Sequence, residues 1–92
     1  MRAKDPVLVD FYADWCKPCN KMEPSVEKVA EEYQGRVEVG KVNTDDCPKV
    51  AQESGVKSIP TLVLFKNGRK VDQEAGARPK DRICEFIDRN VS

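Results

Sequence analysis

The sequence contains no histidine among its 92 residues. Histidine is the usual general base near neutral pH and a common zinc ligand, so its absence excludes a Cys–His protease and the most frequent metal ligand. Excess charge is absent as well, because sixteen Lys and Arg residues balance sixteen Asp and Glu residues. A neutral chain lacks the electrostatic attraction that brings proteins to nucleic acid or to anionic membranes, and we expect neither partner.

Long hydrophobic runs are also missing, and none approaches the ~20 residues that span a bilayer. The N-terminal stretch "MRAKDPVLVDFY" lacks the apolar segment and the cleavage site of a secretory signal peptide. These absences predict a cytoplasmic protein. The length predicts one domain over residues 1–92, because chains divide into domains only at much greater lengths.

Four cysteines are present, and two of them lie three residues apart in the stretch "ADWCKPCNKMEP", residues 13–24. In a cytosolic domain, cysteines indicate redox or metal chemistry more often than a disulfide scaffold. The other two, Cys47 and Cys84, are isolated in the sequence. The question is therefore what Cys16 and Cys19 do together.

Hydrophobic periodicity predicts an α/β fold with the order β-α-β-α-β-β-α. Strands are expected over residues 6–13, 36–43, 61–66 and 69–75, and helices from the cysteine motif to about 34, over 48–54 and from 79 onward. A helix between the first two strands makes them parallel, whereas Asn67-Gly68 predicts an antiparallel hairpin between the last two. The result is a four-stranded mixed sheet with helices on both faces. Asp45 or Asp46 is expected to cap the second helix, and Pro24 to kink the first.

Three kinds of site can use a Cys-x-x-Cys pair. Zinc or an iron–sulfur cluster usually needs a second close pair, which the isolated cysteines do not supply. A structural disulfide closing so short a loop constrains the unfolded chain little. A redox centre fits better, because a helix N-terminus at Cys16 lowers the pKa of its thiol and makes it the attacking sulfur. Cys19 then resolves the mixed disulfide, and Lys17 adds a nearby positive charge.

The segments "VLVDFYADWCKPC", "KMEP", "KVNTDD" and "GVKSIPTLVLFKNG", followed by "GA" at 76–77, resemble the thioredoxin family over essentially the whole chain. The resemblance implies the thioredoxin fold and a protein disulfide reductase that carries electrons. It also implies no cofactor beyond the redox-active Cys16–Cys19 disulfide, and recharging by a thioredoxin reductase. The partners it implies are disulfide-containing target proteins, and the oligomeric state it implies is a monomer.

The resemblance also assigns roles to individual residues. Cys16 is the implied nucleophile and Cys19 the resolving thiol, with Asp10 as a buried acid behind them and Lys41 close to it. The implied substrate-binding residues surround this pair and are Trp15, Lys17, Pro18, Ile59, Pro60, Gly76 and Ala77. Pro60 matches a cis-proline facing the disulfide, and the Ile59 backbone would pair with an extended target peptide.

Simpler readings of these residues remain open at this stage. Burial in a central strand would raise the pKa of Asp10 and suit proton exchange with Cys19, but Asp10 could also be solvated or capping at a strand end. Pro60 could be an ordinary trans turn residue, and Trp15 could belong to the core.

The two isolated cysteines have interpretations of their own. Cys84 is interpreted as a small packed hydrophobic residue, whereas Cys47 is either a bystander or a regulatory thiol.

The chain departs from the family pattern at its start, where thioredoxins carry a further strand and helix. The strand at 37–42 should therefore form an edge, guarded by Glu38 and Lys41 or covered by a second copy. Lys17 replaces the commoner glycine, and Arg78 adds a charge beside the substrate loop. Two rivals remain for the function: a glutaredoxin-like oxidoreductase, and a thioredoxin-like module that binds proteins without turnover.

Replacing Lys17 with Gly should raise the pKa of the Cys16 thiol modestly. The lysine stabilises the thiolate, but a solvated cation contributes little beside the helix end. The rate of alkylation of reduced Cys16, followed against pH, measures this effect. A lower Cys16 pKa in the Lys17→Gly variant would contradict the electrostatic argument.

Overall fold

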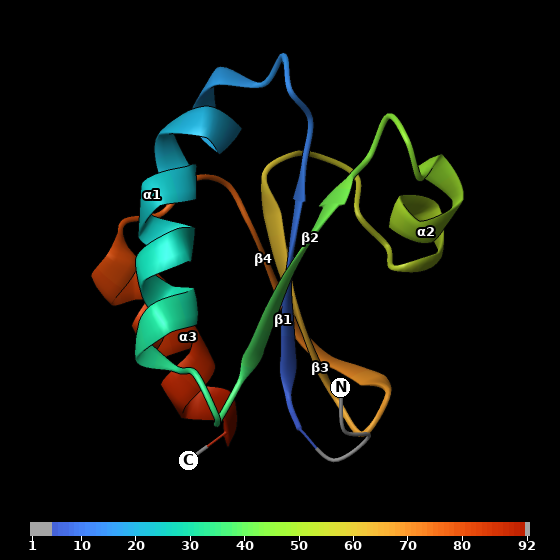
Figure 1. Cartoon of the computed structure of the whole chain (residues 1–92). Helices are drawn as coiled ribbons and strands as arrows, with labels where there is room; N and C mark the ends of the chain where they lie inside the picture. Colours follow the sequence, from blue (N-terminus) through green and yellow to red (C-terminus); the bar gives the residue numbers. More distant parts are fainter. Residues whose placement is uncertain (1–4, 92) are drawn as a thin grey trace.

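The computed structural model describes residues 5–91 (Figure 1). Its elements follow the chain as β1 (Val7–Tyr12), α1 (Lys17–Glu32), β2 (Glu38–Asn43), α2 (Pro48–Glu53), β3 (Thr61–Lys66), β4 (Arg69–Ala75) and α3 (Lys80–Val91). This order confirms the predicted β-α-β-α-β-β-α arrangement. The four strands form one mixed sheet in the order β2-β1-β3-β4.

β1 is an interior strand of this sheet. It pairs in parallel with β2 and antiparallel with β3, so both of its edges are hydrogen-bonded. Its two faces are buried as well, because Leu8 and Phe11, which point to opposite faces, are 0% and 1% exposed. β1 ends at Tyr12, directly before the cysteine motif, and thus anchors that motif to the centre of the protein.

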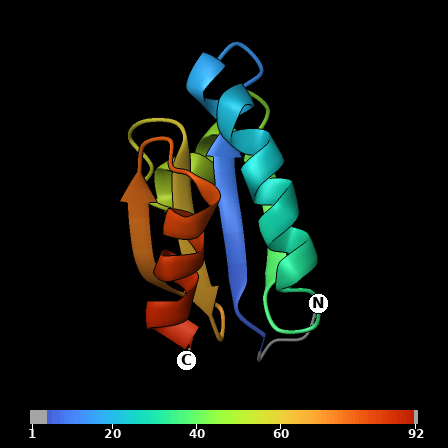
Figure 2. The ribbon, with the colours of Figure 1, turned by 90° about the vertical axis from the view of Figure 1, so that its left-hand side faces the viewer.

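Helices cover both faces of the sheet. α1 and α3 lie side by side against one face, and the short α2 lies against the upper part of the other (Figures 1 and 2). The larger hydrophobic core fills the space between the sheet and the α1–α3 pair, and its buried residues are Leu8, Met22, Val26, Val29, Tyr33, Val37, Leu62, Leu64, Ile83, Phe86 and Ile87. A smaller core around Phe11, Ala51 and Val63 lies under α2.

The hairpin between β3 and β4 forms where the sequence predicts it. Asn67 and Gly68 have φ angles of 55° and 77°, which place both residues in the left-handed region. Asparagine and glycine adopt this region at the least steric cost, so the two-residue turn is determined locally.

The predicted cap of α2 is wrong. Cys47 occupies the N-cap position and makes no capping hydrogen bond with its side chain. Asp45 lies two residues before this position, and its carboxylate accepts a hydrogen bond of 2.9 Å from the Trp15 indole. Pro48 begins the helix instead, at a position where a missing backbone N–H is tolerated.

α1 continues through Pro24 as one helix of sixteen residues. The proline removes one backbone hydrogen bond, but Met22, Val26 and Val29 on the inner face remain buried in the core and hold the helix to the sheet. Within residues 5–91, no helix combines the length and the apolar character required to cross a membrane.

Candidate active site

The cysteine motif forms the junction between β1 and α1. Cys16 is the N-cap residue of α1, with extended backbone angles, and Pro18 lies in the first turn of the helix. The Cys16 N–H donates to the carbonyl oxygen of Ala13 at 3.2 Å, which closes the turn that leads out of the strand. The sulfur of Cys16 therefore sits where the unpaired N–H groups of the helix begin.

Cys16 and Cys19 are joined by a disulfide, and their Cα atoms lie 5.2 Å apart. The backbone N–H of Cys19 donates to Sγ of Cys16 at 3.2 Å. In the reduced protein this N–H and the positive end of α1 would both stabilise a thiolate at Cys16. The two residues are almost equally buried, at 4% and 3% exposure, so burial alone does not distinguish their roles.

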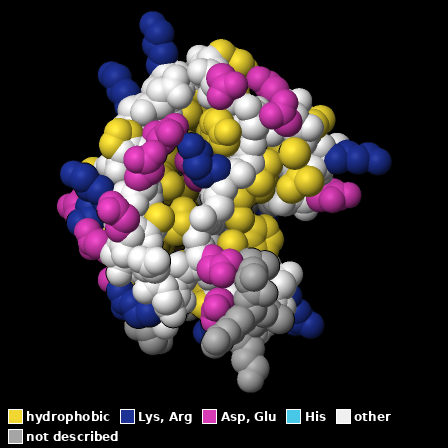
Figure 3. Space-filling model, in the orientation of Figure 1, with side chains coloured by type: hydrophobic (Ala, Val, Ile, Leu, Met, Phe, Trp, Pro, Cys, Tyr) yellow, Lys and Arg dark blue, Asp and Glu magenta, His cyan; other side chains and the backbone are white. Residues whose placement is uncertain are grey.

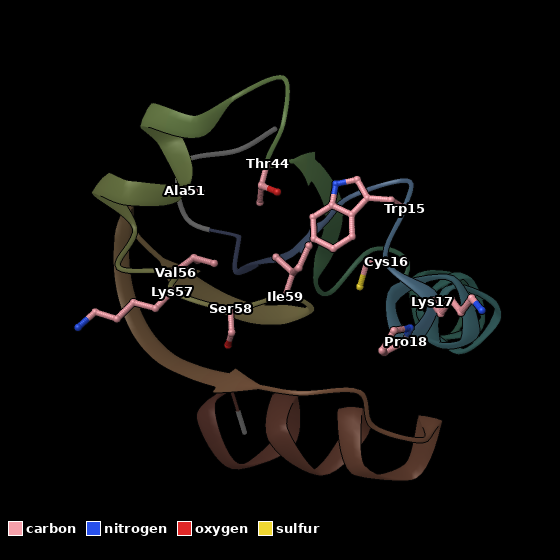
Figure 4. Close-up of a pocket in the computed structure, with 10 residues that line it drawn as sticks. All are labelled: Trp15, Cys16, Lys17, Pro18, Thr44, Ala51, Val56, Lys57, Ser58 and Ile59. Atoms are coloured by element: carbon pink, nitrogen blue, oxygen red, sulfur yellow. The ribbon is translucent and has the colours of Figure 1, made fainter.

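The two cysteines differ in what they border. A hollow of about 600 Å³ opens beside Cys16, and Figure 4 shows its sulfur between Ile59 and Pro18, beneath the indole of Trp15. The residues that line this hollow are Trp15, Cys16, Lys17, Pro18, Thr44, Ala51, Val56, Lys57, Ser58 and Ile59. Cys19 is not among them, because it lies one turn further into α1, packed with Ala13 and Ile59.

Trp15 lies on the surface beside the hollow. Its side chain is 69% exposed, so the possibility that it belongs to the core is wrong. Its Nε1 donates a hydrogen bond to Asp45, which lies in the segment that follows β2. This bond fixes the indole ring beside the hollow. An exposed aromatic ring held in place by a side-chain hydrogen bond is suited to contact a bound protein.

The Ile59–Pro60 peptide bond is cis, as the resemblance implies. Ile59 is half-buried and packs against the cluster of Ala13 and the two cysteines, whereas Pro60 is buried. The carbonyl oxygen of Pro60 accepts a hydrogen bond of 2.8 Å from the N–H of Gly76. Gly76 has a φ of 99°, which a side chain would disfavour, and neither it nor the exposed Ala77 lines the hollow.

Asp10 is buried at the centre of β1, with 1% of its surface exposed. The interpretation of Asp10 as a solvated or capping residue is therefore wrong. Burial raises the pKa of Asp10 to about 6, the positive charge of Lys41 opposes this rise, and the negative charge of Glu23 adds to it. Within residues 5–91 its Oδ1 atom has no hydrogen-bond partner, so nothing compensates for the loss of water at this atom.

Lys41 is the register partner of Asp10 on β2, which explains its effect on the acid. Its ammonium group forms an ion pair of 3.2 Å with Glu23 of α1 and lies 4.8 Å from the centre of the Tyr12 ring. Lys41 thus reaches the surface between α1 and β2 and moderates the charge of Asp10 without a direct hydrogen bond.

Five residues of the hollow were not predicted from the sequence. Val56, Lys57 and Ser58 directly precede Ile59, and their place in "GVKSIPT" was a signal that could have found them. Thr44 and Ala51 come from a different part of the chain, and only the crossover from β2 to α2 brings them to Cys16. Thr44 follows β2, so it lies at the same end of the parallel strands as the cysteine motif.

The remaining cysteines lie apart from this site. Cys47 is exposed before α2, and the half-buried Cys84 packs against the larger core from α3. The packing of Cys84 agrees with its interpretation as a small hydrophobic residue. Within the described part of the chain, no three His, Cys, Asp or Glu side chains gather in a way that could hold a metal ion.

Replacing Asp10 with Asn should change how stability depends on pH. The carboxyl has a pKa of about 6 in the native chain against 3.8 in the unfolded one. Its stabilising contribution is therefore complete below about pH 4 and is lost as the pH rises through about 6, at a cost of roughly 2–3 kcal/mol. The Asp10→Asn variant escapes this loss and should exceed the original protein in stability near pH 8.

Urea unfolding of the oxidised protein and of the Asp10→Asn variant, measured from about pH 4 to about pH 8, tests this expectation. The difference between the two proteins isolates Asp10 from the other carboxyl groups. If the free energies of unfolding of the two proteins changed in parallel across that range, Asp10 would have the same pKa in the folded and the unfolded chain, which would contradict this expectation.

Comparisons with known proteins agree with this geometry. The sequence model of the thioredoxin family, described as "Thioredoxin", matches residues 1–89. Thioredoxin 1 of Nostoc sp. is 48% identical over 94% of this chain and 80% of its own length. A chloroplastic M-type thioredoxin of Triticum aestivum is 44% identical over 96% of this chain, which spans 50% of that protein.

A solved structure of a thioredoxin has the same fold as this chain. A mutant thioredoxin from Halobacterium salinarum superimposes with a TM-score of 0.88 at 40% sequence identity, covering 97% of this chain and 77% of its own. The family match, the relatives and the disulfide-linked Cys-x-x-Cys pair together support reduction of protein disulfides. The chain belongs to the thioredoxin family and is a thiol–disulfide oxidoreductase.

Proposed function

We propose that Cys16 is the nucleophile and Cys19 the resolving thiol of this protein disulfide reductase. The observation that carries the proposal is that only Cys16 of the pair lines the hollow beside the disulfide. A target sulfur that enters the hollow meets Cys16, which also occupies the activating end of α1. Cys19 is absent from the lining of the hollow and is bonded to Cys16.

The reaction proceeds in two exchanges. The Cys16 thiolate attacks one sulfur of the target disulfide, forms a mixed disulfide and releases the other target sulfur as a thiolate. Cys19 then loses its proton and attacks the Cys16 sulfur, which forms the Cys16–Cys19 disulfide and releases the second target thiolate. The target gains two electrons and takes up protons, and the pair of cysteines is oxidised by the same two electrons.

Asp10 is the proposed acceptor of the Cys19 proton. Its carboxyl belongs to β1, on the face that α1 covers, and α1 carries Cys19. A pKa of about 6 leaves the group ionised for much of the time at neutral pH and still basic enough to accept a proton. Lys41 tunes this acid through its charge and does not itself exchange the proton.

The hollow is the proposed binding site for an extended segment of the target. Trp15, Pro18 and Ile59 supply its apolar contacts beside the reacting sulfur. Within residues 5–91 the backbone of Ile59 makes no hydrogen bond, so its polar groups are free to pair with a target strand. Gly76 and Ala77 would close the groove from the far side, held by the Pro60–Gly76 hydrogen bond.

The proposal extends to partners and location. The two cysteines supply all the redox chemistry, so no further cofactor is required, and a thioredoxin reductase returns the electrons. Such a cycle maintains target proteins in the reduced state in a reducing compartment such as the cytoplasm. The named relatives support a thioredoxin-type cycle, and one of them is described as chloroplastic.

Turnover on a protein disulfide, with dithiothreitol as the electron donor, tests this function. We expect many target disulfides to be reduced per molecule of protein, because the Cys16–Cys19 pair is regenerated after each exchange. A variant with Ser in place of both cysteines is the control. Stoichiometric binding of the target without turnover would instead favour a binding module.

Replacing Cys19 with Ser should trap target proteins on Cys16 as mixed disulfides that dithiothreitol releases. The Cys16→Ser variant should trap almost none, because Cys19 does not border the hollow. Both variants belong in a Cys47→Ser background, since Cys47 is exposed and can form adducts of its own. Non-reducing gel electrophoresis counts the adducts, and preferential trapping by Cys19 would exchange the two roles.

The Asp10→Asn variant should slow the resolution of mixed disulfides more than the initial attack. An amide cannot accept the Cys19 proton, whereas the Cys16 thiolate is stabilised mainly by the end of α1. Rapid-mixing experiments that follow the rise and decay of the mixed disulfide separate the two steps. Equal slowing of both, or no change in either, would rule out the proton-transfer role.

A further inference from the structure

Two carboxylates lie on the side of Lys41, and the structure shows which of them the lysine binds. Lys41 is the register partner of Asp10, so the two side chains leave neighbouring parallel strands on the same face of the sheet. The ammonium group nevertheless lies 3.2 Å from Oε1 of Glu23 on α1. Within residues 5–91 it forms no ion pair with Asp10, whose Oδ1 atom has no hydrogen-bond partner. Lys41 therefore binds the partly exposed carboxylate and not the buried one.

Two contacts hold this ammonium group at the surface. Glu23 supplies the ion pair, and the centre of the Tyr12 ring lies 4.8 Å from the ammonium nitrogen of Lys41. The side chains of Lys41 and Glu23 are 34% and 40% exposed, whereas Asp10 is 1% exposed. Figure 3 views the molecule from the side of α1 and β2, and basic and acidic side chains lie next to one another on this surface.

The charged groups that face Asp10 come from two elements. Burial raises the pKa of Asp10 most, the positive charge of Lys41 on β2 lowers it, and the negative charge of Glu23 on α1 raises it. α1 also carries Cys19, whose thiol titrates only in the reduced protein. On the other side of β1, β3 places the apolar Leu62 opposite Asp10, and α3 contributes apolar residues to the core on this face.

We propose that Glu23 is a positioning residue, which holds the Lys41 ammonium at the surface and thereby prevents it from pairing with the Asp10 carboxylate. The inference rests on the proposed role of Asp10 as the acceptor of the Cys19 proton. A cation paired with Asp10 would stabilise the ionised carboxylate and make it a weaker base. Glu23 thus preserves the basicity of Asp10 and acts on the reaction through Lys41.

The lysine side chain can exchange one carboxylate for the other. Its ammonium group is carried on a flexible four-carbon stem, and neighbouring strands lie only about 4.8 Å apart, so the stem starts beside Asp10. Without the Glu23 carboxylate, Lys41 loses the one ion pair that it forms within residues 5–91. The negative charge of Asp10 then attracts the ammonium inward, and the hydration that the ammonium loses limits the effect.

The Glu23→Gln variant tests the proposal in the oxidised protein. An opposite charge at about 4–6 Å lowers the pKa of a carboxyl group by roughly 1–3 units, and a partly hydrated ammonium belongs at the low end of this range. We therefore expect the pKa of Asp10 to fall by about one pH unit from its value of about 6. NMR titration of the Asp10 carboxyl carbon measures this pKa without any redox reaction. An unchanged or higher pKa would overturn the proposal.

The matched control is Glu27→Gln, which removes the same charge one turn further along α1. Glu27 is exposed and is not among the charges that act on Asp10. Water and salt screen so distant a charge, so the pKa of Asp10 should change by less than about 0.2 pH units. A fall as large as that in Glu23→Gln would mean that any loss of negative charge suffices, which would contradict a specific contact.

A second background separates the two ways in which Glu23 can act on Asp10. Its charge repels the ionised carboxylate directly, and it also withholds Lys41. In the Lys41→Gln background only the direct repulsion remains, so Glu23→Gln should lower the pKa of Asp10 by less than about half as much as in the original chain. An equal fall in the two backgrounds would assign the whole effect to direct repulsion and overturn the positioning role.

The rate at which Cys19 resolves mixed disulfides gives the readout in the reaction. A weaker base removes the Cys19 proton more slowly, and with a Brønsted slope of about one half the Glu23→Gln variant should resolve about threefold more slowly at about pH 8. Its carboxylate stays ionised to lower pH, so the variant should be the faster protein below about pH 5.5. A purely structural effect would slow the step by the same factor at every pH and would count against the proposal.

Rapid mixing of both proteins with a target disulfide across this pH range follows the resolution step, and the Asp10→Asn variant separates this inference from the proposed function. If the pKa of Asp10 is the same in Glu23→Gln while Asp10→Asn still slows resolution, the positioning role is wrong and the proposed function stands. If Asp10→Asn leaves resolution unaltered, the proton-transfer role itself is wrong, whatever Glu23→Gln does to the pKa. A lower Asp10 pKa in Glu23→Gln together with crossing pH profiles would establish the positioning role.

Discussion

The structure depends on the double burial of β1. Both edges of this strand are hydrogen-bonded to neighbours, and both of its faces lie under hydrophobic cores. The strand cannot slide or rotate without breaking two ladders of hydrogen bonds and exposing Leu8 or Phe11. The position of its last residue is therefore fixed, and with it the position of the turn that places Cys16 at the start of α1.

The same burial also changes the pKa of Asp10. A carboxyl group in such a strand loses its water, and no described residue donates a hydrogen bond to its Oδ1 atom. This loss destabilises the ionised form and raises the pKa of Asp10 to about 6, the range that the proposed proton exchange with Cys19 requires. A buried acid that costs folding stability at neutral pH is a typical compromise between stability and function.

The local parts of the fold could be predicted because their causes are local. The Asn67-Gly68 turn follows from the left-handed conformations that these two residues tolerate, and the bounds of β3 and β4 followed from it. The cap of α2 could not be predicted in this way. Asp45 has the right chemistry and lies near the helix, but Trp15, thirty residues earlier, binds its carboxylate.

The sequence by itself determined the order of the elements, the Cys-x-x-Cys pair at a helix start and the family, because these depend on neighbouring residues and on spacing. Only the tertiary structure decided that Trp15 lies exposed beside the hollow, that Thr44 and Ala51 line the hollow, and that Asp10 is buried. These features depend on how distant segments meet across the sheet. The conformational preferences of single residues do not encode these contacts. The contacts form only in the folded chain, where side chains from distant segments compete for the same partner.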